Sequence, residues 1–111
     1  MTTPEFDLEA DEIVDLSDQI SEALERSDAD ELNTLMDSVT ISEALRELLS
    51  LSTADQDKLI SLISAEIASE LIDEAPPELA GMLIERQETA KAVEIFDELD
   101  SNVQADVLAE L

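Results

Sequence analysis

The sequence predicts an all-α fold, a solenoid of about eight short helices, from three observations. Residues 40–111 divide into the 24-residue units 40–63, 64–87 and 88–111, whose apolar positions recur in register. One Gly and three Pro in the whole chain leave little material for hairpins or long loops. Hydrophobic residues make up 44% of the sequence although it has no Trp or Tyr, so the core is aliphatic. A repeat of this period is typical of stacked units that cannot bury their apolar faces alone.

The repeat is visible as columns of residues that share a position in successive units. The apolar columns are Ala44, Ala68 and Ala92; Leu48, Ile72 and Phe96; and Leu59, Leu83 and Val107. The second and third units also share acidic positions, which are Glu70 with Glu94, Asp73 with Asp97, and Glu74 with Glu98. The first unit is predicted to slip by about one position at its Leu48-Leu49 pair. Each column predicts one line of the buried face.

Before the repeat, the sequence predicts a leader and two helices. Residues 1–15 hold six acids and no base, which predicts a solvated, flexible leader. An apolar stripe from Leu16 to Leu24 predicts a helix that ends near Arg26, with Ser17 as its start signal. The next helix carries the stripe Leu32, Leu35 and Met36. Asp28 is its predicted N-cap, with Glu31 at the spacing of a capping box.

Each 24-residue unit predicts a pair of helices joined by a short corner. Ser52, with Asp55 three residues later, and Ser64 are predicted N-caps. Pro76-Pro77 ends one helix and begins the next, because proline cannot continue a helix but suits its first turn. Asp100-Ser101 is the last corner. The predicted buried stripes are Ile41, Ala44, Leu45, Leu48 and Leu49; Leu59, Ile60 and Ile63; Ile67, Ala68, Leu71 and Ile72; Leu79, Met82, Leu83 and Ile84; Ala92, Val93, Ile95 and Phe96; and Val103, Val107 and Leu108.

The charge balance restricts the partners of this protein. Thirty acids against five bases give a net charge of -25, which disfavours nucleic acid and anionic lipid surfaces because both present phosphate charge. A cation or a basic protein surface is the expected partner, and the alternative is an acidic surface that serves solubility alone. The apolar runs are far shorter than the ~20 residues that span a bilayer, and the N-terminus lacks the basic start of a signal peptide. We therefore expect a cytosolic domain without direct membrane insertion.

Catalysis is not expected from this composition. The chain has no His, Cys, Tyr or Trp, so general acid-base and nucleophilic chemistry would depend on carboxylates, hydroxyls and lysines. Lys58 and Lys91 are predicted to face solvent. With Gly81 as the only glycine, a phosphate-binding glycine-rich loop is excluded, and the absence of Cys excludes thiolate zinc sites.

Two segments resemble a known family. Residues 75–83, with the sequence APPELAGML, and residues 96–111 are similar to the helix pairs of the intracellular N domain of MgtE-type magnesium transporters. The resemblance covers about residues 17–111. It implies a right-handed superhelix that precedes a tandem CBS module and a membrane pore, in a homodimeric transporter. It also implies that Mg²⁺ bridges acidic residues of this domain and of the CBS module, and so closes the pore.

The resemblance also implies positions for the Mg²⁺ ligands. One family carboxylate falls on Glu70 and a second on Asn102, whose amide carries no charge, so Asp100 or Asp106 is the alternative there. From the residues themselves, acids three and four apart share a helix face, and stacked units would align two such sets into a ridge. Mg²⁺ suits such a ridge because it accepts one or two carboxylates and keeps waters. The predicted metal-binding residues are Glu70, Asp73, Glu74, Glu94, Asp97, Glu98, Asp100 and Asp106.

Two alternatives remain open at this point. These acids also fit the solvent-facing side of ordinary amphipathic helices. The runner-up function is an armadillo- or HEAT-like scaffold without a metal role, whose curved face binds a basic peptide or protein surface. Met36 and Met82 are candidates for such a face, although methionines at helical spacing among leucines are more often core.

Overall fold

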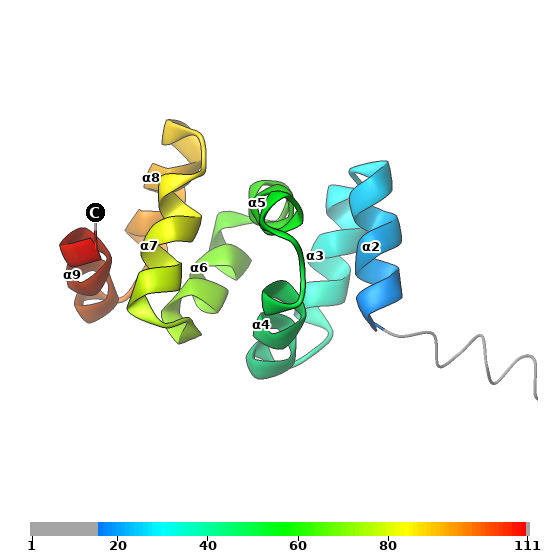
Figure 1. Cartoon of the computed structure of the whole chain (residues 1–111), viewed down its shortest axis with the longest axis horizontal. Helices are drawn as coiled ribbons and strands as arrows, with labels where there is room; N and C mark the ends of the chain where they lie inside the picture. Colours follow the sequence, from blue (N-terminus) through cyan, green and yellow to red (C-terminus); the bar gives the residue numbers. More distant parts are fainter. Residues whose placement is uncertain (1–15, 111) are drawn as a thin grey trace, which may run out of the picture.

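The computed structural model describes residues 16–110, and within them it contains eight α-helices and no strand (Figure 1). The all-α prediction is confirmed. The predicted leader, residues 1–15, lies outside the described residues. The helices are α2 (Leu16–Arg26), α3 (Ala29–Asp37), α4 (Ile41–Leu49), α5 (Thr53–Leu62), α6 (Ala65–Glu74), α7 (Pro77–Glu85), α8 (Thr89–Glu98) and α9 (Ser101–Glu110).

The helices follow one another along the molecule from α2 to α9 (Figure 1). From α3 onwards, each helix packs on the helix two places later, as α4 does on α6, α6 on α8 and α7 on α9. The pairs α4–α5, α6–α7 and α8–α9 coincide with the three predicted 24-residue units. Each unit therefore contacts the next, as stacked helical pairs do. The solenoid superhelix and its right-handed sense stay predictions.

Local capping fixes where the helices begin. Thr40 forms a reciprocal capping box with Glu43, and Ser52 and Ser64 accept hydrogen bonds from the backbone N–H groups three residues later. Asp28 accepts from the Glu31 N–H at 3.1 Å, so its predicted role is confirmed. Such caps satisfy N–H groups that the first helical turn leaves unpaired. The other predicted start signal, Ser17, lies inside the first described turn of α2 and not before it.

Proline sets the corner between α6 and α7. Helix α6 ends at Glu74, Pro76 occupies the N-cap of α7, and Pro77 is its first residue. This confirms the predicted corner. The reason is that a proline at the first helical position loses only an N–H that would have no partner in the helix.

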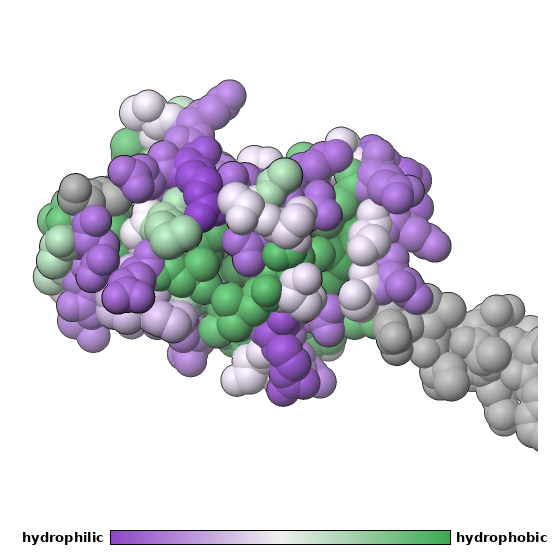
Figure 2. All heavy atoms as spheres, in the orientation of Figure 1, coloured by the Kyte–Doolittle hydropathy of each residue, from purple (hydrophilic) through white to green (hydrophobic). Residues whose placement is uncertain are grey.

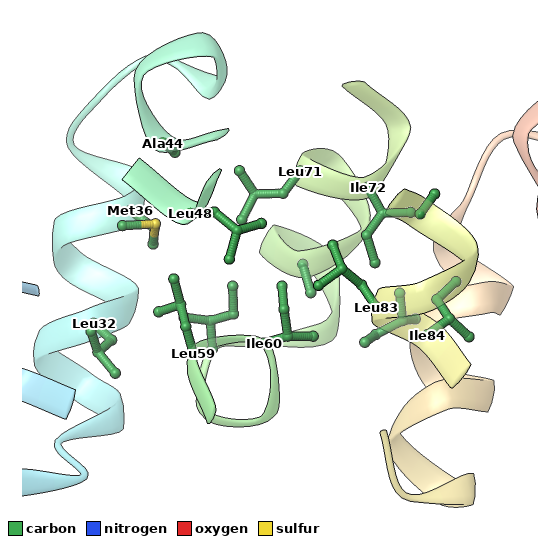
Figure 3. Packing of buried hydrophobic residues seen from close by; sticks show 14 of the residues in the cluster. Leu32, Met36, Ala44, Leu48, Leu59, Ile60, Leu71, Ile72, Leu83 and Ile84 are labelled. Atoms are coloured by element: carbon green, nitrogen blue, oxygen red, sulfur yellow. The ribbon is translucent and has the colours of Figure 1, made fainter. Parts of the chain in front are cut away.

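The core is a continuous aliphatic layer between successive helices (Figure 3). All members of the Leu59, Leu83 and Val107 column are fully buried. Leu48 is fully buried, like Ile72 at the same position of the second unit, whereas Leu49 is exposed. The first unit therefore aligns without a shift, and the predicted slip is wrong. The visible face of the molecule mixes hydrophilic side chains with an apolar band between them (Figure 2).

Four residues from the predicted buried stripes are exposed instead, namely Leu49, Met82, Val93 and Leu108. Each lies beside buried neighbours, because a run of adjacent apolar residues on a helix is wider than the strip that the neighbouring helices cover. The prediction that Lys91 faces solvent is also wrong, since it is half-buried and hydrogen-bonded. None of the described helices is long and apolar enough to cross a bilayer.

Candidate metal-binding surface

The two acidic sets of the repeat lie on helices that pack against each other. Helix α6 carries Glu70, Asp73 and Glu74, and α8 carries the repeat copies Glu94, Asp97 and Glu98. Their spacing follows from the helical period, which places residues three and four apart on one face. All of them are exposed except Asp73, which is half-buried. The α6–α8 pair therefore collects the predicted acids of two successive units.

Asp73 and Asp100 meet where the two units join. The backbone N–H of Asp100, in the corner between α8 and α9, donates a long hydrogen bond of 3.4 Å to the Asp73 Oδ1. This contact brings together two predicted ligands that are 27 residues apart in sequence. A side-chain carboxylate of one unit is thereby held at the corner of the next.

The environment of Asp73 disfavours its negative charge. Desolvation raises the pKa of this carboxyl, the nearby charges of Asp100 and Glu74 raise it further, and the hydrogen bond from the Asp100 N–H acts in the opposite direction. A cation placed here would offset the effects of desolvation and of the neighbouring charges, because opposite charge stabilises a carboxylate. The junction is thus electrostatically suited to cation binding.

A groove lies between the acids of α8 and the beginning of α6. Ser64 and Ala65 line it on one side, and Glu94, Asp97 and Glu98 on the other.

Lys91 lies in the same groove, and its Nζ donates a 2.6 Å hydrogen bond to the backbone carbonyl oxygen of Ile63, at the end of α5. A cationic side chain at a helix C-terminus satisfies an unpaired carbonyl. The ammonium is therefore directed at the backbone, and its charge is close to the acids without an ion pair to any of them.

Glu70 faces a different groove, between α3 and α6. Asp37 and Glu66 share that groove with it, and the Asn33 Oδ1 accepts a 2.7 Å hydrogen bond from the Ser64 N–H across it. Sequence reasoning missed Asp37 and Glu66 as neighbours of Glu70. Asp37 belongs to α3, which precedes the 24-residue units, so the column alignment contained no signal for it.

Asp106 and Asn102 lie apart from these groups. Both are exposed on α9, and no hydrogen bond or ion pair ties either of them to another predicted ligand within residues 16–110. Among those residues, no three acidic side chains converge closely enough to hold a metal ion by themselves. The structure thus brings together Asp73 with Asp100 and Glu94 with Asp97 and Glu98, and it separates Glu70 and Asp106 from them.

Two of the basic side chains form ion pairs away from the predicted ligands. Arg86 pairs with Asp57 at 3.1 Å and joins α7 to α5, while Arg26 pairs with Asp28 at 3.6 Å. None of the eight predicted ligands takes part in an ion pair of the described region. Carboxylate oxygens without a basic partner are the donors that Mg²⁺ prefers, and one or two of them with several waters complete its coordination.

One comparison with known proteins gives a match. The family described as the MgtE intracellular N domain matches residues 36–111, which extends from the end of α3 through α9. The comparisons with curated proteins and with solved structures give no match. The family match covers more than half of the chain and includes all three 24-residue units. The chain therefore belongs to the family of intracellular N domains of MgtE magnesium transporters.

Proposed function

We propose that this protein is the cytosolic regulatory domain of a magnesium transporter, and that it senses Mg²⁺ through acidic residues that bridge to a CBS module. Bound Mg²⁺ would hold the cytosolic parts together and close the membrane pore of the same transporter chain. That parent is expected to be a homodimer. The family membership supports the transporter assignment. The contact between Asp73 and Asp100 is the observation that carries the sensing role.

The mechanism rests on the cost of bringing acidic surfaces together. Two carboxylates ~6 Å apart repel by roughly 3 kcal/mol at an effective dielectric of about 20, but by less than ~1 kcal/mol in bulk water. On the free domain most of these acids are exposed, so water screens them. When a second acidic surface displaces that water, the repulsion rises and a divalent cation is needed to offset it. Assembly therefore becomes dependent on the Mg²⁺ concentration.

Within residues 16–110 too few acids converge to hold a metal ion alone, which supports a division of the ligands between two domains. The Asp73 carboxylate lies at the corner where it accepts the hydrogen bond from the Asp100 N–H, and Glu94, Asp97 and Glu98 of α8 line a groove. Mg²⁺ retains several waters and does not require a complete protein cage. A second domain could thus provide the remaining oxygens directly or through water.

A titration of the full transporter chain and of this domain alone tests the proposal. Millimolar MgCl₂ should shift the amide NMR signals around Asp73 and Asp97 weakly in the domain alone and strongly when the CBS module is attached. NaCl at matched ionic strength should reproduce only a small part of the shift, because screening by monovalent ions is not coordination.

Two variants and a control make the test residue-specific. Asp73→Asn and Asp97→Asn should each weaken the Mg²⁺-dependent closure, measured as protection from protease of the segment between this domain and the CBS module in the full chain. Glu22→Gln, an exposed acid on α2, removes the same charge far along the stack and should leave the closure unchanged. Contact with the CBS module that is insensitive to Mg²⁺ would instead favour the scaffold function, in which a basic surface binds without metal.

A further inference from the structure

The outer side of the last helical pair carries an apolar surface, which we call the terminal face. It is a groove formed by Ile84 of α7, by Ala92, Val93 and Phe96 of α8, and by Leu108 of α9. Val93 is 53% exposed and Leu108 is 60% exposed. They are two of the four large hydrophobic side chains that are exposed in the described part of the chain.

The repeat shows what covers this surface elsewhere in the same molecule. Subtracting 24 from each residue number gives the equivalent positions of the preceding unit, which are Ile60, Ala68, Ser69, Ile72 and Ile84. All five are buried, and the least buried of them is 5% exposed. Figure 3 shows Ile60, Ile72 and Ile84 directed into the interior between successive helices.

Those equivalent positions are buried because another helical pair lies over them. Helix α8 packs on α6 and α9 packs on α7. The terminal face therefore occupies the positions at which one helical pair of this molecule packs on the next. By this internal comparison, the occupant of the groove is an amphipathic helix, placed on α8 as α8 is placed on α6.

The charges around the terminal face select the chemistry of that helix. Glu85 lines the groove, and Asp97 is one turn from Val93 on the same side of α8. Both are exposed, and neither is in an ion pair of the described region. A second copy of this chain is disfavoured because each copy carries a net charge of -25. Lysine or arginine beside the apolar stripe of the partner would instead be attracted to the groove.

We infer that the terminal face is a docking site for a partner helix that has an aliphatic stripe flanked by basic residues. This inference does not depend on Mg²⁺ sensing. The partner would bury Val93 and Leu108 as their equivalents Ser69 and Ile84 are buried in the second unit. Complementary charges would set its orientation and speed its association.

The experiment uses a synthetic peptide of about 18 residues, five helical turns, with Leu at stripe positions and Lys beside them. Binding to the protein is measured by NMR of the side-chain methyl groups, in the presence of a chelator and at about 0.15 M salt. The methyl signals of Val93 and Leu108 should move, and the peptide should become helical. A scrambled peptide of the same composition has no stripe and should bind much more weakly.

Substitutions at exposed positions test the site without disturbing the core. Val93→Asp and Leu108→Asp should each weaken binding of the striped peptide by at least about tenfold, as expected for an anchor of a helix-in-groove contact. Met82→Asp introduces the same charge at another exposed apolar residue, 46% exposed and outside the groove, and should leave the affinity unchanged. Circular dichroism of every variant verifies that it is folded.

Three results would overturn the inference. The first is equal binding of the striped and scrambled peptides, which would show that charge alone attracts them. The second is binding that Met82→Asp reduces as much as Leu108→Asp does. The third is a protein dimer, seen by sedimentation without peptide and abolished by Leu108→Asp, because a second copy would then occupy the face. Since a chelator is present throughout, failure here is distinguishable from failure of Mg²⁺ sensing.

Discussion

One column of the repeat predicts a gradient of stability costs along the molecule. Ile60, Ile84 and Leu108 occupy the same position in three successive units, and their exposed fractions are 0%, 5% and 60%. Replacing each by Ala removes a similar volume but leaves a cavity only where neighbours surround the side chain. We expect Ile60→Ala and Ile84→Ala each to lower the free energy of unfolding by about 3 kcal/mol, within the range of roughly 2 to 5 for buried residues.

Leu108→Ala should cost less than about 1 kcal/mol. Most of this side chain already contacts water, so little of the roughly 1.5 to 3 kcal/mol for full burial is at stake. Ala has a stronger helix propensity than Leu, which offsets the loss of stability on α9 by a few tenths of a kcal/mol. The difference of about 2 kcal/mol between the two kinds of site exceeds the usual error of a denaturation experiment.

Urea unfolding followed by helical circular dichroism measures these costs, since the absence of Trp and Tyr leaves no strong fluorescence signal. A constant slope of free energy against urea shows that the variants unfold in the same cooperative transition as the parent. A cost for Leu108→Ala equal to that of Ile60→Ala would refute the reasoning. It would mean that the terminal unit is covered in solution and that no free apolar face exists.

Three further substitutions are expected to separate local contacts from helix propensity and charge. Gly81→Ala should give none of the roughly 1 kcal/mol that Ala gains over Gly in a helix, because its new Cβ would lie 2.9 Å from the Glu110 Cβ on α9. In urea unfolding, the gain from Gly81→Ala should reappear when it is measured in the Glu110→Gly background. Asp73→Asn should stabilise the metal-free protein at neutral pH, because the pKa of Asp73 is raised in the folded state and stability is lost as pH rises and Asp73 ionises. The gain should vanish in acid, where Asp73 is protonated, and Asp97→Asn, at an exposed site, should give a smaller gain. Lys91→Met should lower the free energy of unfolding in urea by about 1 to 2 kcal/mol, because it removes a charged hydrogen bond and a favourable helix-dipole contact at the end of α5. A cost near zero would show that this hydrogen bond does not persist in solution.

The sequence predicts the helices well because their determinants are local. Thr40, Ser52 and Ser64 bond to N–H groups three residues away, and Pro76-Pro77 ends one helix and starts another through the ring of proline itself. The repeat extends this local information, since a corner found in one unit is expected at the same place in the next. Fold class and helix pairing therefore follow from the residues alone.

The sequence is less informative about which edge of an apolar stripe is buried. Leu48 and Leu49 are adjacent and equally hydrophobic, yet the first is buried and the second is exposed. Val93 occupies the position at which Ser69 is buried, because the next helical pair covers α6 but no described pair covers α8. Burial at these positions depends on the crossing of neighbouring helices, which hydrophobic periodicity does not contain.

The candidate metal surface is predictable in part for the same reason. Column alignment predicts that α6 and α8 bring their acids together, whereas the contact in the structure joins Asp73 of α6 to the backbone N–H of Asp100, in the corner after α8. The alignment does not predict that Glu70 faces α3 and shares a groove with Asp37. Three steps of about 100° leave Glu70 and Asp73 about 60° apart around the axis of α6, so they share a broad face but border different grooves.

The two proposed surfaces meet on α8 and can still act separately. With about 100° of rotation per residue, Glu94 and Glu98 lie on one side of this helix and Ala92 and Phe96 lie nearly opposite. Asp97 lies between the two sides, one turn from Val93 at the rim of the terminal face. A cation held by the acids would therefore weaken the attraction for a basic partner helix at this rim, while it left the apolar contact intact. Mg²⁺ should then slow association of the striped peptide more than it speeds dissociation, because rim charges act mainly on the rate of encounter.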